Sequence, residues 1–202
     1  MMLARASVAC MTAATLVACT HPQLDASGVD AQLPMQAGSE AVVRDAPARE
    51  RAAIVNPELW VLVERADDPF DDRPASASTD CVPAAVMAED LAGERVLGVD
   101  TGSCSYVTTV QLSQREVVSG EVIHVRVWHF ELTASEPAQA HVAVVVDGID
   151  VLNERVMIPQ PGGLITTQLQ VTRAIPAGAR VYFHLHNHGA NNWALVEVSA
   201  GP

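Results

Sequence analysis

The sequence predicts an all-β protein, a single antiparallel β-sandwich of about eight strands with a jelly-roll-like arrangement. From residue 94 onward, short runs rich in branched apolar residues are separated by turn residues, as in sandwich folds. No helical periodicity interrupts these runs. With 202 residues, 49% of them apolar, the chain can form one domain with its own core, a targeting segment and a linker.

The first nineteen residues have the composition of an export sequence. Arg5 is followed by an apolar run over residues 6–18, which is too short to remain in a membrane as a spanning helix. The run ends in LVAC at Cys19, which resembles the lipobox of bacterial lipoproteins. The resemblance implies removal of residues 1–18 and acylation of Cys19, so that the membrane is a partner through the lipid. The alternative is an ordinary signal peptide that contains a cysteine.

The residue after the lipidation position indicates in which membrane a lipoprotein resides. In lipoproteins of bacteria with two membranes, Asp at this position favours retention in the inner membrane, and here it is Thr20. The resemblance therefore implies a lipid-anchored protein of the bacterial cell envelope, located at the outer membrane.

A flexible tether is expected over residues 19–55, followed by the sandwich domain over residues 56–202. The tether is rich in Pro, Ala, Gly, Ser, Asp and Gln and has no sustained periodicity. The first apolar run, LWVLV at 59–63, favours a buried strand over a helix that begins at Asn56. The following segment 67–79 carries four aspartates in a spacing that matches no calcium loop, so we interpret it as a solvated acidic loop.

Two of the four cysteines are available for a structural role. Cys10 leaves with the export sequence and Cys19 takes the lipid, which leaves Cys81 and Cys104. Because an exported protein folds in an oxidising compartment, these two are expected to form a disulfide.

The expected strands follow from apolar runs bounded by turn residues. Asp147-Gly148 lies between two such runs and predicts a two-residue hairpin. The runs lie at residues 94–100, 105–112, 121–132, 141–152 (two strands around the hairpin), 164–171, 180–187 and 193–198.

Side chains alternate between the two faces of a strand, so the faces of three expected strands can be assigned. The aliphatic set, which we expect to form the core, is Ile123, Val125, Val127, Val181, Phe183, Leu185, Ala194, Val196 and Val198. The opposite set is His124, Arg126, Trp128, Phe130, Tyr182, His184, His186, Trp193, Leu195 and Glu197. If these strands are neighbours in one sheet, the second set forms an outer face rich in aromatic and polar groups.

A first hypothesis is that this face binds carbohydrate. Sugar rings stack their C–H patches on aromatic side chains, and their hydroxyls need planar donors and acceptors. The sequence VYFHLHNHGANNWALVEV at 181–198 looks like the closing strands of galactose-binding-like jelly rolls and carbohydrate-binding modules. The resemblance is one of pattern over residues 94–200, and no family site residue is carried over. The predicted ligand-binding residues are Arg126, Trp128, Tyr182, His184, His186, Asn191 and Trp193.

A second hypothesis is a transition-metal site. The His184-x-His186 pair puts two imidazoles on one face of a strand, about 6–7 Å apart at Cα, a spacing used in Zn and Cu sites. His188 is the third ligand in this alternative, and His124, His129 and His141 are other candidates. The preferred expectation is a module without a cofactor.

A third hypothesis is purely structural. The segment HNHGANNW at 186–193 can be a tight loop in which His and Asn side chains satisfy backbone groups, with the tryptophans partly in the core. His129 shares a face with Val127 and is expected to be a buried imidazole. The three hypotheses stay open at this point.

The chain's composition excludes other function classes. The net charge is −12 and no basic stripe is present, which argues against nucleic acid as a partner. Ser103 lies in DTGSCS, which lacks the nucleophile-elbow pattern of serine hydrolases. We therefore expect a non-enzymatic binding or interaction module whose partner is a glycan or an envelope protein.

Overall fold

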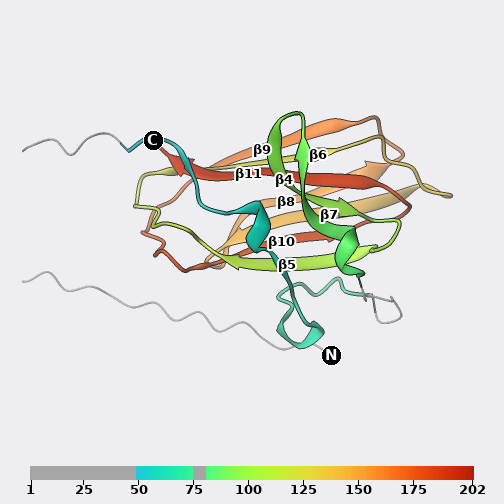
Figure 1. Cartoon of the computed structure of the whole chain (residues 1–202), viewed down its shortest axis with the longest axis horizontal. Coiled ribbons are helices and arrows are strands. Elements are labelled where there is room, and N and C mark those ends of the chain that lie inside the picture. The colour runs from blue at the N-terminus through green and yellow to red at the C-terminus, as the bar shows by residue number, and fades with distance from the viewer. Residues whose placement is uncertain (1–48, 75–80) are drawn as a thin grey trace, which may run out of the picture. The chain divides into compact units, whose positions relative to one another are not determined.

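The computed structural model describes residues 49–74 and 81–202, which form two antiparallel sheets packed face to face (Figure 1). The predicted all-β sandwich is therefore confirmed. The predicted signal peptide, the lipidation residue Cys19 and most of the predicted tether lie outside the described residues.

The two sheets are named here sheet I and sheet II. Sheet I has the order β3 (Val86–Leu91), β4 (Glu94–Asp100), β11 (Asn192–Gly201), β6 (Val122–His129) and β9 (Gly163–Gln170), and the short β1 (Ala52–Ala53) also pairs with β11. Sheet II has the order β2 (Val61–Leu62), β5 (Tyr106–Leu112), β10 (Arg180–His186), β7 (Ala138–Val146) and β8 (Ile149–Ile158). Three short 3₁₀ turns are η1 (Pro57–Leu59), η2 (Arg65–Asp67) and η3 (Pro83–Ala85).

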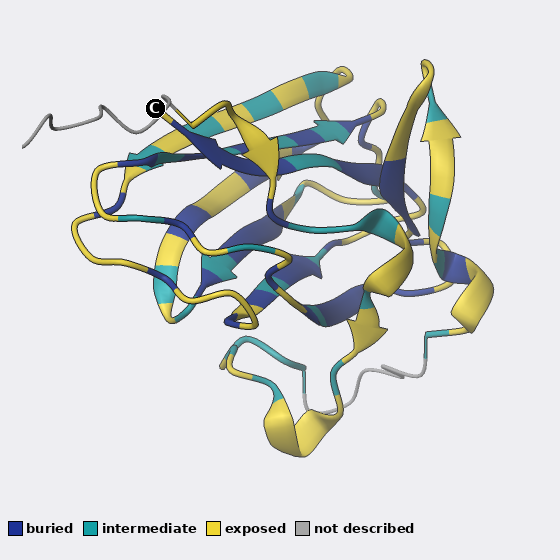
Figure 2. Ribbon diagram, turned by 60° about the vertical axis from the view of Figure 1, so that its left-hand side comes forward, coloured by how far each residue is buried: buried dark blue, intermediate teal, exposed yellow. Residues whose placement is uncertain are grey.

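The chain alternates between the sheets, so that successive strands contribute to both layers. From β4 to β11 it changes sheet at every connection except the β7–β8 hairpin. That hairpin turns at Asp147 and Gly148, whose φ values of 51° and 75° are those of the predicted two-residue turn. The buried surfaces of both sheets face each other, with exposed residues on loops and outer faces (Figure 2).

The core includes the aliphatic faces predicted for two of the strands. Val125 and Val127 of β6 and Val181 and Phe183 of β10 are at most 1% exposed, as alternation predicts. Burying each such side chain contributes roughly 1.5–3 kcal/mol to folding.

Residues 52–54, which precede the predicted boundary at residue 56, already contact the sandwich. Ala52 and Ala53 pair with the end of β11, and Ile54 is completely buried in the core. The amide of Ile54 also donates to the carbonyl oxygen of Val198 at 3.0 Å, so this short apolar run is attached to β11 of sheet I. The predicted strand at 59–63 is reduced to two residues, because the Asn56 side chain caps η1 by accepting the N–H of Glu58.

The predicted disulfide between Cys81 and Cys104 is present. It joins the segment before β3 to the start of β5, and so connects the two sheets near their ends. Within residues 49–74 and 81–202, we find no helix of the length and apolar character that a membrane span requires.

Candidate functional site

The structure divides the predicted ligand-binding residues between the two sheets. Arg126 and Trp128 lie on β6 in sheet I, whereas Tyr182, His184 and His186 lie on β10 in sheet II. The single outer face that would combine them is therefore not formed. Sheet I and sheet II each present their own outer surface.

Trp193 does not lie on an outer face, and its predicted exposure is wrong. It is 1% exposed and packs in the core against His129, with ring centroids 5.0 Å apart. The reason is a bulge between Leu195 and Glu197, which inserts one residue into β11. Leu195 before the bulge and Val198 after it both face the core, so the alternation that we counted from Val198 fails for Trp193.

Asn191 is a structural residue of the loop before β11. Its side chain accepts the N–H of Thr133 at 2.7 Å and donates to the carbonyl oxygens of Thr133 and His188. Asn187 likewise donates to Thr101 Oγ1 at 2.8 Å. The structural hypothesis therefore describes the asparagines of this loop, and Asn191, at 1% exposure, is unavailable to a ligand.

The outer face of sheet I carries an aromatic hollow. Trp128 and Phe130 are edge to face with ring centroids 6.3 Å apart, and Phe130 is 43% exposed. Together with Leu164 of β9 and Arg126 they line a hollow of about 350 Å³. We call this surface the aromatic hollow.

A polar strip continues from the aromatic hollow along the same face. Arg126 lies 3.5 Å from a carboxylate oxygen of Glu197 and 3.8 Å from one of Glu94. Beside β6, strand β9 exposes every second side chain on this face. These exposed β9 side chains are Leu164, Thr166, Gln168 and Gln170. The face thus offers aromatic rings at one end and amide, hydroxyl, carboxylate and guanidinium groups along its length.

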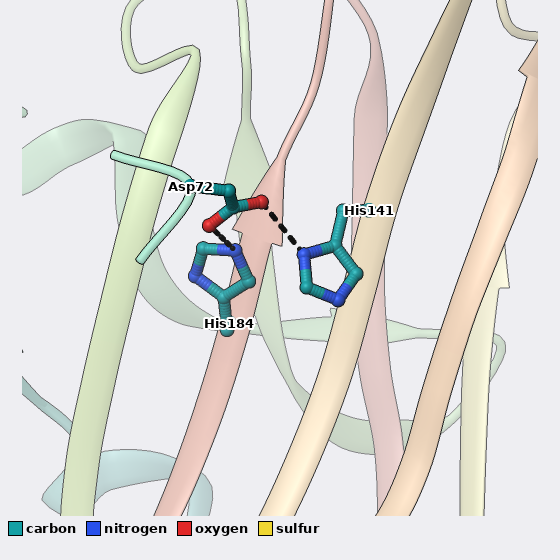
Figure 3. A group of neighbouring side chains, drawn as sticks. All are labelled: Asp72, His141 and His184. Atoms are coloured by element: carbon teal, nitrogen blue, oxygen red, sulfur yellow. Dashed lines mark hydrogen bonds and ion pairs between the residues drawn. The ribbon is translucent and has the colours of Figure 1, made fainter. Parts of the chain in front are cut away.

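The outer face of sheet II carries a buried cluster of histidines around one carboxylate (Figure 3). Asp72 lies with Oδ2 2.7 Å from Nδ1 of His141 and with Oδ1 3.2 Å from Nε2 of His184. His141 is on β7 and His184 on the neighbouring β10. His186 is farther out, with Nδ1 3.4 Å from Asp72 Oδ2. We call Asp72, His141 and His184 the Asp–His cluster.

Residues 63–74 cover this part of sheet II and bury the cluster; we call them the covering segment. Phe70 stacks on the imidazole of His184 at 4.1 Å, which leaves His184 with no exposed surface although it points away from the core. The side chain of Asp68 is only 2% exposed. It accepts hydrogen bonds from Tyr106 at 2.9 Å and Thr108 at 3.1 Å and pairs with Arg73 at 3.3 Å. The predicted solvated loop is therefore wrong for Asp68 and Asp72.

Burial and charge set the protonation of the cluster. Burial lowers the pKa of His184 to about 4, although the Asp72 carboxylate opposes this, so the imidazole is neutral at pH 7. Burial alone would raise the pKa of Asp72, but the hydrogen bond with His141 and the nearby imidazoles lower it below its ordinary value. The cluster therefore combines an ionised carboxylate with at least one neutral imidazole.

The histidines of the proposed metal alternative are only partly brought together. His184 and His186 share an outer face as predicted, but the third nitrogen beside Asp72 comes from His141 and not from His188. His188 lies outward, next to His186 at 5.1 Å between ring centroids. Asp72 was not predicted as a site residue. The one local indication was Phe70, a large apolar residue within an acidic loop.

Comparisons with known proteins give similarity at the level of the fold. No protein-family model and no curated protein matches the sequence. The mannan-recognising carbohydrate-binding module TmCBM27 is 7% identical, with 77% of this chain and 97% of that chain covered at a TM-score of 0.43. TmCBM61, solved with β-1,4-galactotriose, is 9% identical, with coverage of 74% and 97% and a TM-score of 0.41. The N-terminal cellulose-binding domain of Cellulomonas fimi β-1,4-glucanase C is 17% identical, with coverage of 61% and 91% and a TM-score of 0.35.

Proposed function

We propose that this protein is an exported, lipid-anchored, non-enzymatic module that binds carbohydrate on the outer face of sheet I. The observation that carries the proposal is the Trp128–Phe130 pair in the aromatic hollow beside the Arg126–Glu197 ion pair. Aromatic rings stack on the C–H faces of sugars, and charged planar groups accept and donate to vicinal hydroxyls. A hollow of about 350 Å³ is of the size that takes one or two sugar rings.

The exposed side chains of β9 extend this surface in a way that suits an oligosaccharide. Thr166 pairs with Arg126 across the two strands and Gln168 with His124, so the polar groups form a row parallel to β6. A row of amides and hydroxyls on a rigid sheet can contact successive sugar units without a loop closing over them. The expected ligand is therefore a chain or chain end of neutral sugars.

Oligosaccharide binding to the purified full-length protein tests the proposal. A glycan array identifies a ligand, and calorimetry then compares the native protein with Trp128→Ala and Phe130→Ala. Each substitution removes one stacking surface and is expected to weaken binding about tenfold or more, which corresponds to about 1.4 kcal/mol.

Tyr182→Ala is the matched control, because Tyr182 is a half-buried aromatic residue on the outer face of the other sheet. This variant is expected to bind like the native protein. The proposal fails if the Trp128→Ala protein is folded and binds equally well, or if only Tyr182→Ala loses binding. Circular dichroism and thermal melting establish that each variant is folded.

The membrane location is a separate part of the proposal and is supported by the LVAC sequence that ends at Cys19. Two or three acyl chains, at about 0.8 kcal/mol per buried methylene, would hold the module at a membrane surface almost permanently. Cys19→Ala is expected to abolish acyl incorporation and to move the protein out of the membrane fraction. Cys10→Ala is the matched control and is expected to change neither. Unchanged acylation of the Cys19→Ala protein would contradict the anchor.

A further inference from the structure

We propose that Asp72, His141 and His184 form a binding site for a divalent transition-metal ion such as Zn²⁺, on the sheet opposite the carbohydrate site. One ligand atom from each of the three residues lies within 4.8 Å of the other two. Two imidazoles and a carboxylate are ligands that zinc and related ions commonly take from proteins. The three side chains converge from β7, β10 and the covering segment (Figure 3).

The contact between Asp72 and His184 is the first observation that points to a cation. Neither Oδ1 of Asp72 nor Nε2 of His184 has a hydrogen-bond partner among the described residues, although both atoms are buried. The two atoms nevertheless face each other at 3.2 Å. A buried, unpartnered polar atom is costly, and here two of them are aimed at the same point.

The hydrogen-bond network of His184 favours a proton on Nδ1 and none on Nε2. Thr108 donates its hydroxyl hydrogen to Asp68, so its oxygen is left to accept the N–H of His184 Nδ1 at 3.0 Å. A neutral imidazole has one N–H, and with this hydrogen on Nδ1 the lone pair of Nε2 points at the Asp72 carboxylate. Two lone pairs at this distance repel each other, and a metal ion between them converts the repulsion into two coordinate bonds.

His141 has more acceptors beside its ring than a neutral imidazole has N–H groups. Its Nδ1 lies 2.7 Å from Oδ2 of Asp72 and its Nε2 lies 3.0 Å from Oδ1 of Asn153, so both ring nitrogens face oxygen atoms. Neutral His141 can donate to only one of them. If Nε2–H donates to Asn153, Nδ1 is a second free imidazole lone pair directed at the cluster.

The groups behind the imidazoles are those expected around metal ligands. Metal-bound histidines usually donate their other N–H to an oxygen acceptor, which fixes the ring and its tautomer. Here the acceptor for His184 is the hydroxyl oxygen of Thr108, which itself donates to Asp68. The acceptor for His141 is Oδ1 of Asn153. The 3.2 Å between Asp72 Oδ1 and His184 Nε2 is also close to the ~3.3 Å separation of two ligands about 2.0 Å from a tetrahedral ion.

His186 contacts both the cluster and a hollow at the protein surface. Its ring lies between Asp72 and the exposed His188, and both histidines line an open hollow together with Arg155. His186 is the nearest additional imidazole, with Nδ1 3.4 Å from Asp72, and is available as a further ligand.

Metal titration of the purified full-length protein tests the inference. After chelator treatment, calorimetry with Zn²⁺ is expected to give one equivalent per chain. Co²⁺ is expected to give the visible absorption of a nitrogen- and oxygen-ligated ion. Asp72→Asn keeps the shape of the side chain and removes its charge, and is expected to weaken Zn²⁺ binding at least 100-fold.

Two histidine variants outside the cluster serve as controls. His188→Gln and His124→Gln are expected to keep Zn²⁺ affinity within about twofold, because neither residue belongs to the cluster. The inference is overturned if the native protein takes up no stoichiometric metal, which would make the cluster a buried ion pair with a protonated imidazole. It is also overturned if Asp72→Asn binds normally while His188→Gln does not. Carbohydrate binding by Asp72→Asn is expected to be unchanged, so failures of the two sites are distinguishable.

Discussion

Trp193 of β11 lies directly opposite His129 of β6, and the two rings are in contact in the core at 5.0 Å between centroids. Trp193 is among the largest fully buried side chains, whereas Trp128, one residue away from His129, lies on the outer face. Trp193→Ala is therefore expected to destabilise the protein by about 3–5 kcal/mol, because a cavity remains in the core. Trp128→Ala is expected to cost less than half of this. Urea unfolding of both variants measures the difference, and equal losses would contradict the assignment.

The same pair of strands illustrates what local sequence could and could not predict. Alternation correctly assigned the inner and outer faces of β6 and β10, because both strands are regular along their length. It failed for Trp193 because a bulge changes the parity of β11. The sequence WALVEV is apolar at every position except Glu197, so no change in its pattern marks the bulge. The bulge belongs to the pairing of β11 with β6, which is tertiary structure that the local sequence does not show.

The Asp–His cluster could not be predicted from a sequence pattern, because its residues are far apart along the chain. Asp72 and His141 are 69 residues apart, and no periodicity connects them. The two strands that carry the histidines were predicted individually, but their adjacency in sheet II was not. We interpret the acidic segment as solvated because the spacing of its aspartates matches no calcium loop. Nothing in the local sequence marks Asp68 as the partner of Tyr106 and Thr108.

In the loop before β11, only glycine fits at position 189 without strain. Gly189 has φ of +92°, and a Cβ atom there would overlap the carbonyl oxygen of Thr133. Gly189→Ala is expected to destabilise the protein by at least about 3 kcal/mol through backbone strain and this overlap. Gly178 has a similar φ of +82° with no atom within 4 Å of the added Cβ, so Gly178→Ala should cost only about 1 kcal/mol. Thermal and urea unfolding compare the two, and equal effects would show that the Thr133 contact is unimportant.

The protein is expected to lose stability at low pH through protonation of Glu197 in sheet I. Burial alone would raise its pKa, but hydrogen bonds from Ser199 and Arg51 and the charges of Arg51 and Arg126 lower it below the ordinary 4.5. A lowered folded-state pKa contributes stability above pH 4.5 that is lost as the pH falls through the folded value. Glu197→Gln should therefore destabilise the protein at pH 7 and much less at pH 3. Urea unfolding at both pH values checks this, and a difference that does not shrink at pH 3 would refute it.

Asp68 is expected to hold the covering segment on sheet II. Its carboxylate accepts from Tyr106 and Thr108 and pairs with Arg73, whose guanidinium lies 5.1 Å from the centre of the Tyr106 ring. Asp68→Ala leaves a guanidinium and two hydroxyls without their acceptor. Because these groups are largely buried, the expected loss is about 2–4 kcal/mol.

Hydrogen exchange locates the effect of Asp68→Ala. The amide of Val63 donates to the carbonyl oxygen of Thr108 at 2.8 Å and attaches the covering segment to β5. In Asp68→Ala, amides of residues 63–74 are expected to exchange faster while those of β6 and β11 remain protected. Asp71→Ala is the matched control, because Asp71 is an exposed aspartate in the same segment and its loss should change stability by less than about 0.5 kcal/mol. Uniformly faster exchange across both sheets would mean that Asp68 supports the whole domain and not this segment.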